Sequence, residues 1–296
     1  MPPSRALPAI CDRAGHPPCR RRGAAGHTWD VTRLAIVSDS HLSPRTPEGD
    51  SNWAAIVDHL ALTDPDVVIH VGDISLDGAH SGEDLAHAKV QLDRLDAPWR
   101  AIPGNHDVGE TDGVEASVVE ARRASYEAVF GDRSWIIDLD DWRLIGIDSQ
   151  ELLNGEAGAE AAWAWLEAQL NSELRLAVSQ HRPLRPLEAT ETDTDRRYII
   201  EPARSRLEGL YQDAGVELLV SGHVHQWRSV DVAGIWHVWV PSSWATLPDD
   251  YQPVIGDKTV GLVEIDLDHH DEAALVVPSA VVQEVVGVTI PFPYAR

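Results

Sequence analysis

The chain has 296 residues, of which 43% are hydrophobic, and its formal net charge at pH 7 is -24. This length and apolar content allow a sizeable core and fit one large α/β domain better than two small ones. An acidic surface repels polyanions, so the composition argues against long nucleic acid or an anionic bilayer as a partner and leaves a small anion compatible. No segment approaches the ~20 apolar residues needed to cross a bilayer, so no transmembrane span is predicted.

Residues 1–32 are rich in Pro, Arg, Gly and Ala without periodicity, which predicts a disordered leader before a folded domain at 33–296. Both cysteines, Cys11 and Cys19, lie in this leader, so no disulfide framework is expected. With His16 they offer only three zinc ligands, whereas a closed structural site needs four. A run of arginines in the leader precedes no apolar segment, so we expect no export signal and a cytoplasmic protein.

From residue 33 onward, short β-branched runs alternate with helical patterns. Strands are expected at 34–37, 67–71 and 99–102, and helices at 52–62, 83–95 and 114–129. This alternation predicts parallel strands joined by crossover helices.

The second half of the chain predicts a further sheet. Runs at 135–139 and 142–147 are separated by two aspartates, which indicates a hairpin and therefore a mixed sheet. A helix is expected at 160–170, and strands at 176–178, 216–220, 236–240, 260–267 and 274–282, with the last two at sheet edges. The polar stretch 185–206 predicts a loop, either over a pocket or on the acidic surface without a role in function.

Polar side chains follow five of these predicted strands at the point where each strand ends. The segments are Asp39-Ser40-His41, Gly72-Asp73, Gly104-Asn105-His106-Asp107, Gln180-His181-Arg182-Pro183 and Gly222-His223-Val224-His225. Each segment alone is explained as well by a turn, a helix cap or a loop histidine. Their joint occurrence at strand ends, which converge on one edge in such folds, predicts a shared metal site.

The ligand types restrict the metal. The i, i+2 spacing of Asp39 and His41 aims both side chains to one side of an extended chain, so they can share a cation. Asp73 stands where it could bridge two cations. Carboxylate and amide oxygens mixed with imidazoles, without a thiolate in the folded part, favour Mn, Fe, Zn or Co over Ca.

The order D-x-H, G-D, G-N-H-D, H-x-P, G-H-x-H, spread over residues 34–225, resembles the calcineurin-like metallophosphoesterase superfamily, most of all its cyclic nucleotide phosphodiesterase branch. The resemblance implies an α/β fold, a four-layer α/β/β/α sandwich of two mixed β-sheets flanked by helices, with two divalent metal ions at the strand ends. It implies one metal held by Asp39, His41, Asp73 and His225, and a second held by Asp73, Asn105, His181 and His223. The family often has a further histidine where this chain has Arg182.

The expected activity is hydrolysis of phosphate esters, above all phosphodiesters such as 3',5'-cyclic nucleotides, by a hydroxide that bridges the two metal ions. His106 is expected to protonate the leaving alkoxide or to stabilise charge on the phosphoryl oxygens. Asp107 is expected to orient that imidazole or to cap the next helix. Arg182 either forks onto a phosphate oxygen or forms a surface salt bridge.

Other functions stay open at this point. They are a phosphomonoesterase, a diesterase for 2',3'-cyclic nucleotides or glycerophosphodiesters, a nuclease, and a metal-binding scaffold without activity. The acidic balance argues against the nuclease. The expected partner is a small phosphate ester, with a cyclic nucleotide as one candidate, and a homo-oligomer is left open. The tryptophans are expected in the core rather than on a base-stacking surface.

Overall fold

The computed structural model describes residues 32–111, 113–139, 141–153, 159–186, 196–267 and 273–289. The chain divides into two compact units, Met1–Asp30 and Val31–Arg296, and every described residue belongs to the second unit. The leader with Cys11, His16 and Cys19 therefore lies outside the described residues, apart from Thr32. Among the described helices, none combines the length and the apolar character that a membrane span requires.

The first sheet has five strands in the order β11-β10-β1-β2-β3. The strands are β1 (Arg33–Val37), β2 (Val67–His70), β3 (Trp99–Ala101), β10 (Leu262–Asp266) and β11 (Ala273–Val276). β1, β2 and β3 run parallel to one another. β10 is antiparallel to β1, and β11 is antiparallel to β10. The outer face packs against α1 (Glu48–Thr63), α2 (Gly82–Leu92) and α4 (Ala116–Phe130).

The second sheet has six strands in the order β4-β5-β6-β7-β9-β8. They are β4 (Trp135–Leu139), β5 (Trp142–Gly146), β6 (Arg175–Ser179), β7 (Val216–Ser221), β8 (Arg228–Val232) and β9 (Ile235–Trp239). β5, β6, β7 and β9 are parallel, and β4 and β8 are antiparallel edge strands. Its outer face packs against α6 (Ala159–Leu170) and α7 (Ala203–Ala214).

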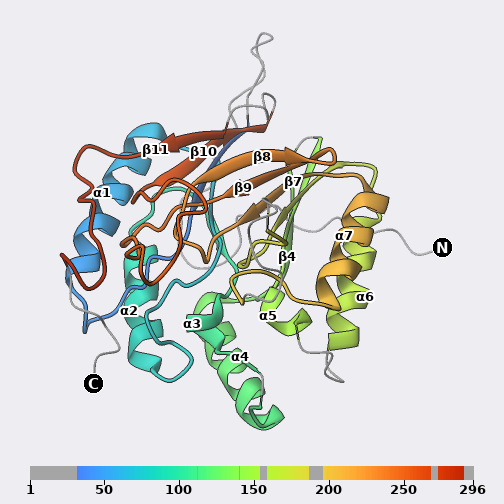
Figure 1. Ribbon diagram of the computed structural model, residues 1–296, viewed down its shortest axis with the longest axis horizontal. Coiled ribbons are helices and arrows are strands. Elements are labelled where there is room, and N and C mark those ends of the chain that lie inside the picture. The colour runs from blue at the N-terminus through green and yellow to red at the C-terminus, as the bar shows by residue number, and fades with distance from the viewer. Residues whose placement is uncertain are drawn as a thin grey trace. The chain divides into compact units, whose positions relative to one another are not determined.

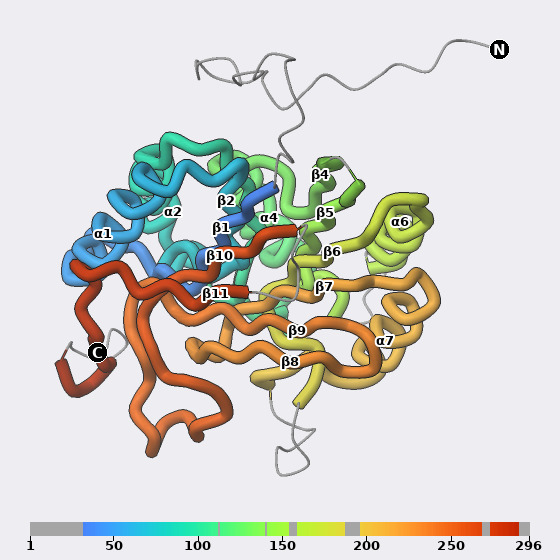
Figure 2. The backbone as a smooth tube through the Cα atoms, turned by 90° about the horizontal axis from the view of Figure 1, so that it is seen from above, coloured from blue at the N-terminus to red at the C-terminus, as the bar shows by residue number. Residues whose placement is uncertain are grey.

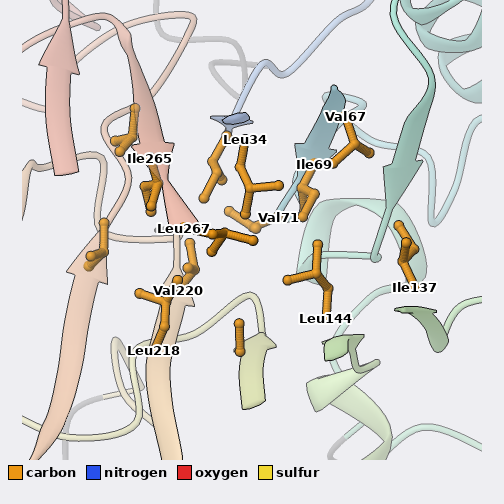
Figure 3. Close-up of a cluster of buried hydrophobic side chains, with 14 of the residues drawn as sticks. Leu34, Val67, Ile69, Val71, Ile137, Leu144, Leu218, Val220, Ile265 and Leu267 are labelled. Atoms are coloured by element: carbon orange, nitrogen blue, oxygen red, sulfur yellow. The ribbon is translucent and has the colours of Figure 1, made fainter. Parts of the chain in front are cut away.

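The main core lies between the two sheets (Figure 3). In β1, Leu34 and Ile36 enter this layer, while Ala35 and Val37 face the helices. Because successive side chains of a strand point to opposite faces, a shift of one residue in register would exchange these two sets. The parallel pairing of β1 with β2 begins at Leu34 opposite Val67, which sends both into the inner layer.

The predicted four-layer sandwich is confirmed. In Figure 2 the layers follow one another across the view, from α1 and α2 through the two sheets to α6 and α7. The crossover order in the first half and the β4–β5 hairpin are also confirmed.

Several elements differ from the prediction. β10 lies inside its sheet, between β1 and β11, rather than at an edge. β11 ends at Val276 because Pro278 follows and has no N–H for a ladder. α7 begins at Ala203, inside the stretch expected to be a loop, and β8 was not expected. Two short helices, α3 (Asn105–Val108) and α5 (Ser149–Leu152), were also missed.

The carboxyl ends of the parallel strands in both sheets meet at one edge. Ser38, after β1, forms a parallel bridge with Ser242, after β9, and the backbone N–H of Ser243 donates to the Ser38 carbonyl at 2.9 Å. Figure 1 shows α3 and α5, which follow β3 and β5, on the same side of the sheets. The polar segments after the strands are thereby brought together.

Candidate metal centre

A first group of side chains joins the loop after β1 to the loop after β7. The Nε2 atoms of His41 and His225 lie 3.1 Å apart, and His225 Nε2 lies 3.4 Å from Asp39 Oδ1. All three residues are buried. One ligand atom from each lies within 4.8 Å of the others, so the group could hold a metal ion.

A second group joins the loops after β2, β6 and β7. His181 Nε2 lies 3.3 Å from Asp73 Oδ2 and 3.1 Å from His223 Nδ1. These three residues also satisfy the distance requirement for a shared ion. Asp73 links the two groups, because the same Oδ2 atom lies 4.0 Å from His41 Nε2.

Several atoms at this edge are suited to bind a cation. His225 Nδ1 donates to the Ala245 carbonyl at 2.8 Å and His181 Nδ1 donates to the Val71 carbonyl at 2.9 Å, so that each ring, when neutral, presents its Nε2 lone pair to its group. The amide oxygen Oδ1 of Asn105 is buried without a hydrogen-bond partner. Such an acceptor costs about 1–3 kcal/mol unless a donor or a cation satisfies it.

The electrostatics favour ionised carboxylates. Burial opposes ionisation of Asp39, but the His225 imidazole beside it holds the pKa of Asp39 below its ordinary value. Burial likewise opposes ionisation of Asp73, and His181 lowers its pKa. In return Asp73 overcomes the effect of burial on His181 and raises the pKa of that imidazole to about 9. The Asp73 carboxylate therefore favours a positive charge at this position, either a proton on His181 or a cation.

Two further imidazoles are held neutral. Burial, followed by the charge of His106, lowers the pKa of His41, and burial, followed by the charge of Arg182, lowers the pKa of His223. Neutral imidazole is the form that binds a metal ion.

The backbone is strained at this edge. Seven non-glycine residues among those described have positive φ, and five of them are candidate ligands: Asp39 (50°), His41 (42°), Asp73 (52°), His223 (69°) and His225 (52°). Each such residue costs of order 1 kcal/mol, and this strain concentrates at functional sites.

A model of the calcineurin-like phosphoesterase family matches residues 32–227. The chain belongs to this family. The match spans all the segments that contain the candidate ligands, and the chain is accordingly a metal-dependent phosphoesterase.

Named relatives agree with the family. The chain is 29% identical over 206 residues to a probable glycerophosphodiester phosphodiesterase GpdQ of Arcobacter nitrofigilis, covering 64% of this chain and 70% of the relative. It is 27% identical over 199 residues to a probable cyclic nucleotide phosphodiesterase of Synechococcus, covering 66% and 72%. The fold is similar to purple acid phosphatase PPD1 of yellow lupin, with a TM-score of 0.59 and 17% identity. That match covers 80% of this chain, which spans about half (49%) of the lupin protein.

Two glycines of the phosphoesterase motifs are required by close approach. A Cβ on Gly104 would lie 2.1 Å from Asp73 Oδ1, and a Cβ on Gly222 would lie 1.8 Å from Ser38 Oγ. Real Cβ atoms essentially never come this close, so only glycine lets these loops pass beside the carboxylates.

His106 lies beside Asp73, as expected for a residue at the site. Its Nε2 is 3.9 Å from Asp73 Oδ2, and its Nδ1 donates to the Leu76 carbonyl at 2.6 Å. The side chain is 24% exposed, so it lies at the opening of the site rather than in the protein interior.

The hydrogen bonds of Asp107 support the second of its two expected roles, that of a helix cap. The Asp107 carboxylate accepts hydrogen bonds from the backbone N–H groups of Ile74, Ser75 and Gly104 and from Ser75 Oγ. It thus caps α3 at Gly104 and ties that helix to the loop after β2. Burial, followed by the charge of Asp73, raises its pKa to about 6.

Arg182 forms a salt bridge, but not on the surface. Its side chain is 3% exposed, and Nη2 donates to Glu110 Oε1 in the loop after α3. Nε is buried without a partner. Nη2 is thus engaged by the protein, whereas Nε is not.

Two residues near the site were not predicted. The Trp244 ring lies 5.1 Å from the His41 ring, and Ser242 Oγ donates to the Asp39 carbonyl at 2.8 Å. Both follow β9, which the sequence predicted as a strand at 236–240. The rule applied to the other five strands would have found Ser242, which is the first polar residue after that strand, but not Trp244.

Proposed function

We propose that this phosphoesterase hydrolyses small phosphodiesters with two divalent cations. Asp39, His41, Asp73 and His225 would hold one cation. Asp73, Asn105, His181 and His223 would hold the other. The observation that supports this arrangement most is the position of the Asp73 carboxylate, which lies within 4.0 Å of imidazoles from both groups.

Diesters are favoured by the relatives. The two that match over about two thirds of this chain are named as probable phosphodiesterases, one for glycerophosphodiesters and one for cyclic nucleotides. We therefore propose 3',5'-cyclic nucleotides and glycerophosphodiesters as the two candidate substrate classes. A phosphomonoester is the alternative.

The chain's own residues have separate tasks in this reaction. A bound pair of Mn, Fe, Zn or Co ions would supply an activated water molecule at neutral pH and neutralise charge on the phosphoryl group. The Leu76 carbonyl holds His106 with Nε2 beside Asp73, so that a protonated His106 would donate from Nε2 to the leaving alkoxide. Arg182 would donate from Nε to a phosphoryl oxygen.

A non-catalytic scaffold would be expected to lack ligands or the histidine at the position of His106. This chain has all seven candidate ligands and His106. A metal analysis that returns no bound cation in the purified protein would favour the scaffold.

The decisive experiment compares substrates with the Mn-loaded full-length protein. The panel contains bis(p-nitrophenyl) phosphate, p-nitrophenyl phosphate, 3',5'- and 2',3'-cyclic nucleotides and a glycerophosphodiester. We expect a higher kcat/KM for diesters than for the monoester. A strong preference for p-nitrophenyl phosphate would overturn the diesterase assignment. Glu217→Gln, at the far end of β7, is a control that should keep activity.

A further inference from the structure

The ion pair between Arg182 and Glu110 lies directly beside the proposed metal centre. Arg182 follows the candidate ligand His181 in sequence, and Gln180 Nε2 donates to the Arg182 carbonyl at 2.7 Å, which fixes the backbone there. Glu110 follows α3, the helix that contains Asn105 and His106. The pair thus connects the loops that follow β3 and β6.

The two partners differ in their access to solvent. Arg182 is buried, with 3% of its side chain exposed, whereas 43% of the Glu110 side chain is exposed. Glu110 is the one acid among the described residues within ion-pair distance of Arg182. Because Glu110 is the counter-ion of this buried guanidinium, removing its carboxylate changes the net charge of the pair from zero to +1.

Of the Nε and Nη2 donors on one edge of the guanidinium, the contact uses Nη2 alone. Nη2 donates to Glu110, whereas Nε is buried without a partner. A buried N–H without an acceptor is unfavourable, so this donor favours binding of an oxygen atom from a ligand. Glu110 therefore neutralises Arg182 without using all of its donors.

Charge balance gives this pair a role in selection. Two divalent cations, ionised Asp39 and Asp73, one hydroxide and neutral imidazoles would carry a net charge of about +1, to which the paired Arg182 and Glu110 add nothing. A phosphodiester brings one negative charge, whereas a phosphomonoester dianion brings two. An unpaired guanidinium beside the centre would therefore attract the dianion more strongly than the monoanion.

We propose that Glu110 is a specificity-determining residue, which favours phosphodiesters over phosphomonoesters by neutralising Arg182 at the edge of the metal centre. This inference rests on the proposed function, because it assumes that phosphate esters bind between the two ligand groups. Glu110 itself does not touch the reacting atoms; it acts through the charge of Arg182.

The test compares Glu110→Gln with the wild-type protein, both Mn-loaded and full-length. We expect the ratio of kcat/KM for bis(p-nitrophenyl) phosphate to that for p-nitrophenyl phosphate to fall by about tenfold in the variant. Isothermal titration calorimetry gives a readout independent of turnover. The Kd of orthophosphate should fall by about tenfold, and the Kd of dimethyl phosphate, a monoanion, by about threefold or less.

Two further variants separate charge from packing. Glu110→Asp keeps the charge and should keep both the kinetic ratio and the phosphate Kd. Glu217→Gln removes one charge from an ion pair of similar exposure (36%) at the opposite end of the strands, and should change neither. Circular dichroism verifies that each variant is folded.

The outcomes distinguish the two proposals. If the wild-type protein prefers the monoester, the proposed diesterase function fails. If the wild type prefers diesters but Glu110→Gln keeps the same kinetic ratio and the same phosphate Kd, the role assigned to Glu110 is wrong and the diesterase assignment stands. A loss of the diester preference in Glu110→Asp as well would indicate packing rather than charge and would also overturn the proposal.

Discussion

At the scale of single residues, Asp73 is the side chain on which both proposed metal positions depend. Asp73→Asn keeps the shape but replaces an anionic oxygen between two groups of imidazoles by a neutral amide. We expect both bound-metal content and kcat/KM for bis(p-nitrophenyl) phosphate to fall, the latter by at least about 100-fold. Elemental analysis together with steady-state kinetics measures this. Full activity with two bound metal ions per chain would contradict the shared carboxylate.

Arg182 is expected to act on substrate binding more than on turnover. In Arg182→Ala the Nε donor disappears and Glu110 loses its partner, so a negative charge is left beside the incoming phosphate. We expect KM to rise by about tenfold or more with a small change in kcat, because a lost contact of about 1.4 kcal/mol is tenfold in affinity. Arg175→Ala, at the start of β6, is the matched control. An unchanged KM in Arg182→Ala would show that Arg182 does not contact the substrate.

The sequence alone predicted that the ligand positions meet at one edge, because strand periodicity and polar strand ends are local signals. It left the roles of Asp107 and Arg182 open for a physical reason. Which N–H groups a carboxylate meets depends on the path of a distant loop, and here the loop after β2 supplies Ile74 and Ser75 to Asp107. The partner of Arg182 lies 72 residues away and follows no pattern in the sequence.

At the scale of elements, the loop after β3 approaches the loop after β2 so closely that Gly104 allows no side chain. In Gly104→Ala the new Cβ would meet Asp73 Oδ1 at 2.1 Å, so that loop and the carboxylate must move apart. We expect a weaker metal affinity, by about tenfold or more, because ligands displaced by this amount no longer share an ion. Titration of metal-free protein with Mn²⁺ measures the change.

Gly209 offers the matched control for this substitution. It lies within α7, and a Cβ there meets no atom within 4 Å. Gly209→Ala should leave Mn²⁺ affinity unchanged and raise the free energy of unfolding by about 0.5–1 kcal/mol, since alanine is the better helix former. Equal loss of metal affinity in both variants would mean that the close approach of Gly104 to Asp73 is not required for metal binding.

The elements that were not predicted have only weak hydrophobic patterns in the sequence. β8 is an edge strand whose residues are alternately half-buried and exposed, so only Val230 and Val232 indicate it. α7 buries Ala203, Leu207 and Tyr211 at helical spacing, but the polar stretch before it concealed its beginning. The length of β11 was overestimated because apolar residues continue past Pro278, where pairing stops.

At the scale of the whole molecule, His237 makes stability depend on pH. Burial, followed by the charge of Arg185, lowers its pKa to about 4 from an ordinary value of 6.5. Between these values the unfolded chain binds a proton that the folded chain does not, so folding free energy is lost as pH falls from 6.5 towards 4. We expect His237→Gln to reduce the stability difference between pH 7 and pH 5 by about 2 kcal/mol. Urea unfolding of metal-free protein at both pH values measures it, and an equal difference in both proteins would contradict the assignment.

Metal binding should stabilise the whole fold, because the candidate ligands come from loops of both sheets. Five candidate ligands with positive φ oppose folding at this edge. Each ion that binds only the folded chain adds about 2.7 kcal/mol at 100 times its Kd, which for a domain of this size corresponds to a rise in Tm of about 5–10 °C per ion. Thermal unfolding with Mn²⁺ and with excess chelator measures the difference, and Asp73→Asn should largely lose it. A Tm that does not respond to Mn²⁺ in the wild-type protein would mean that the loops meet at this edge without holding a metal.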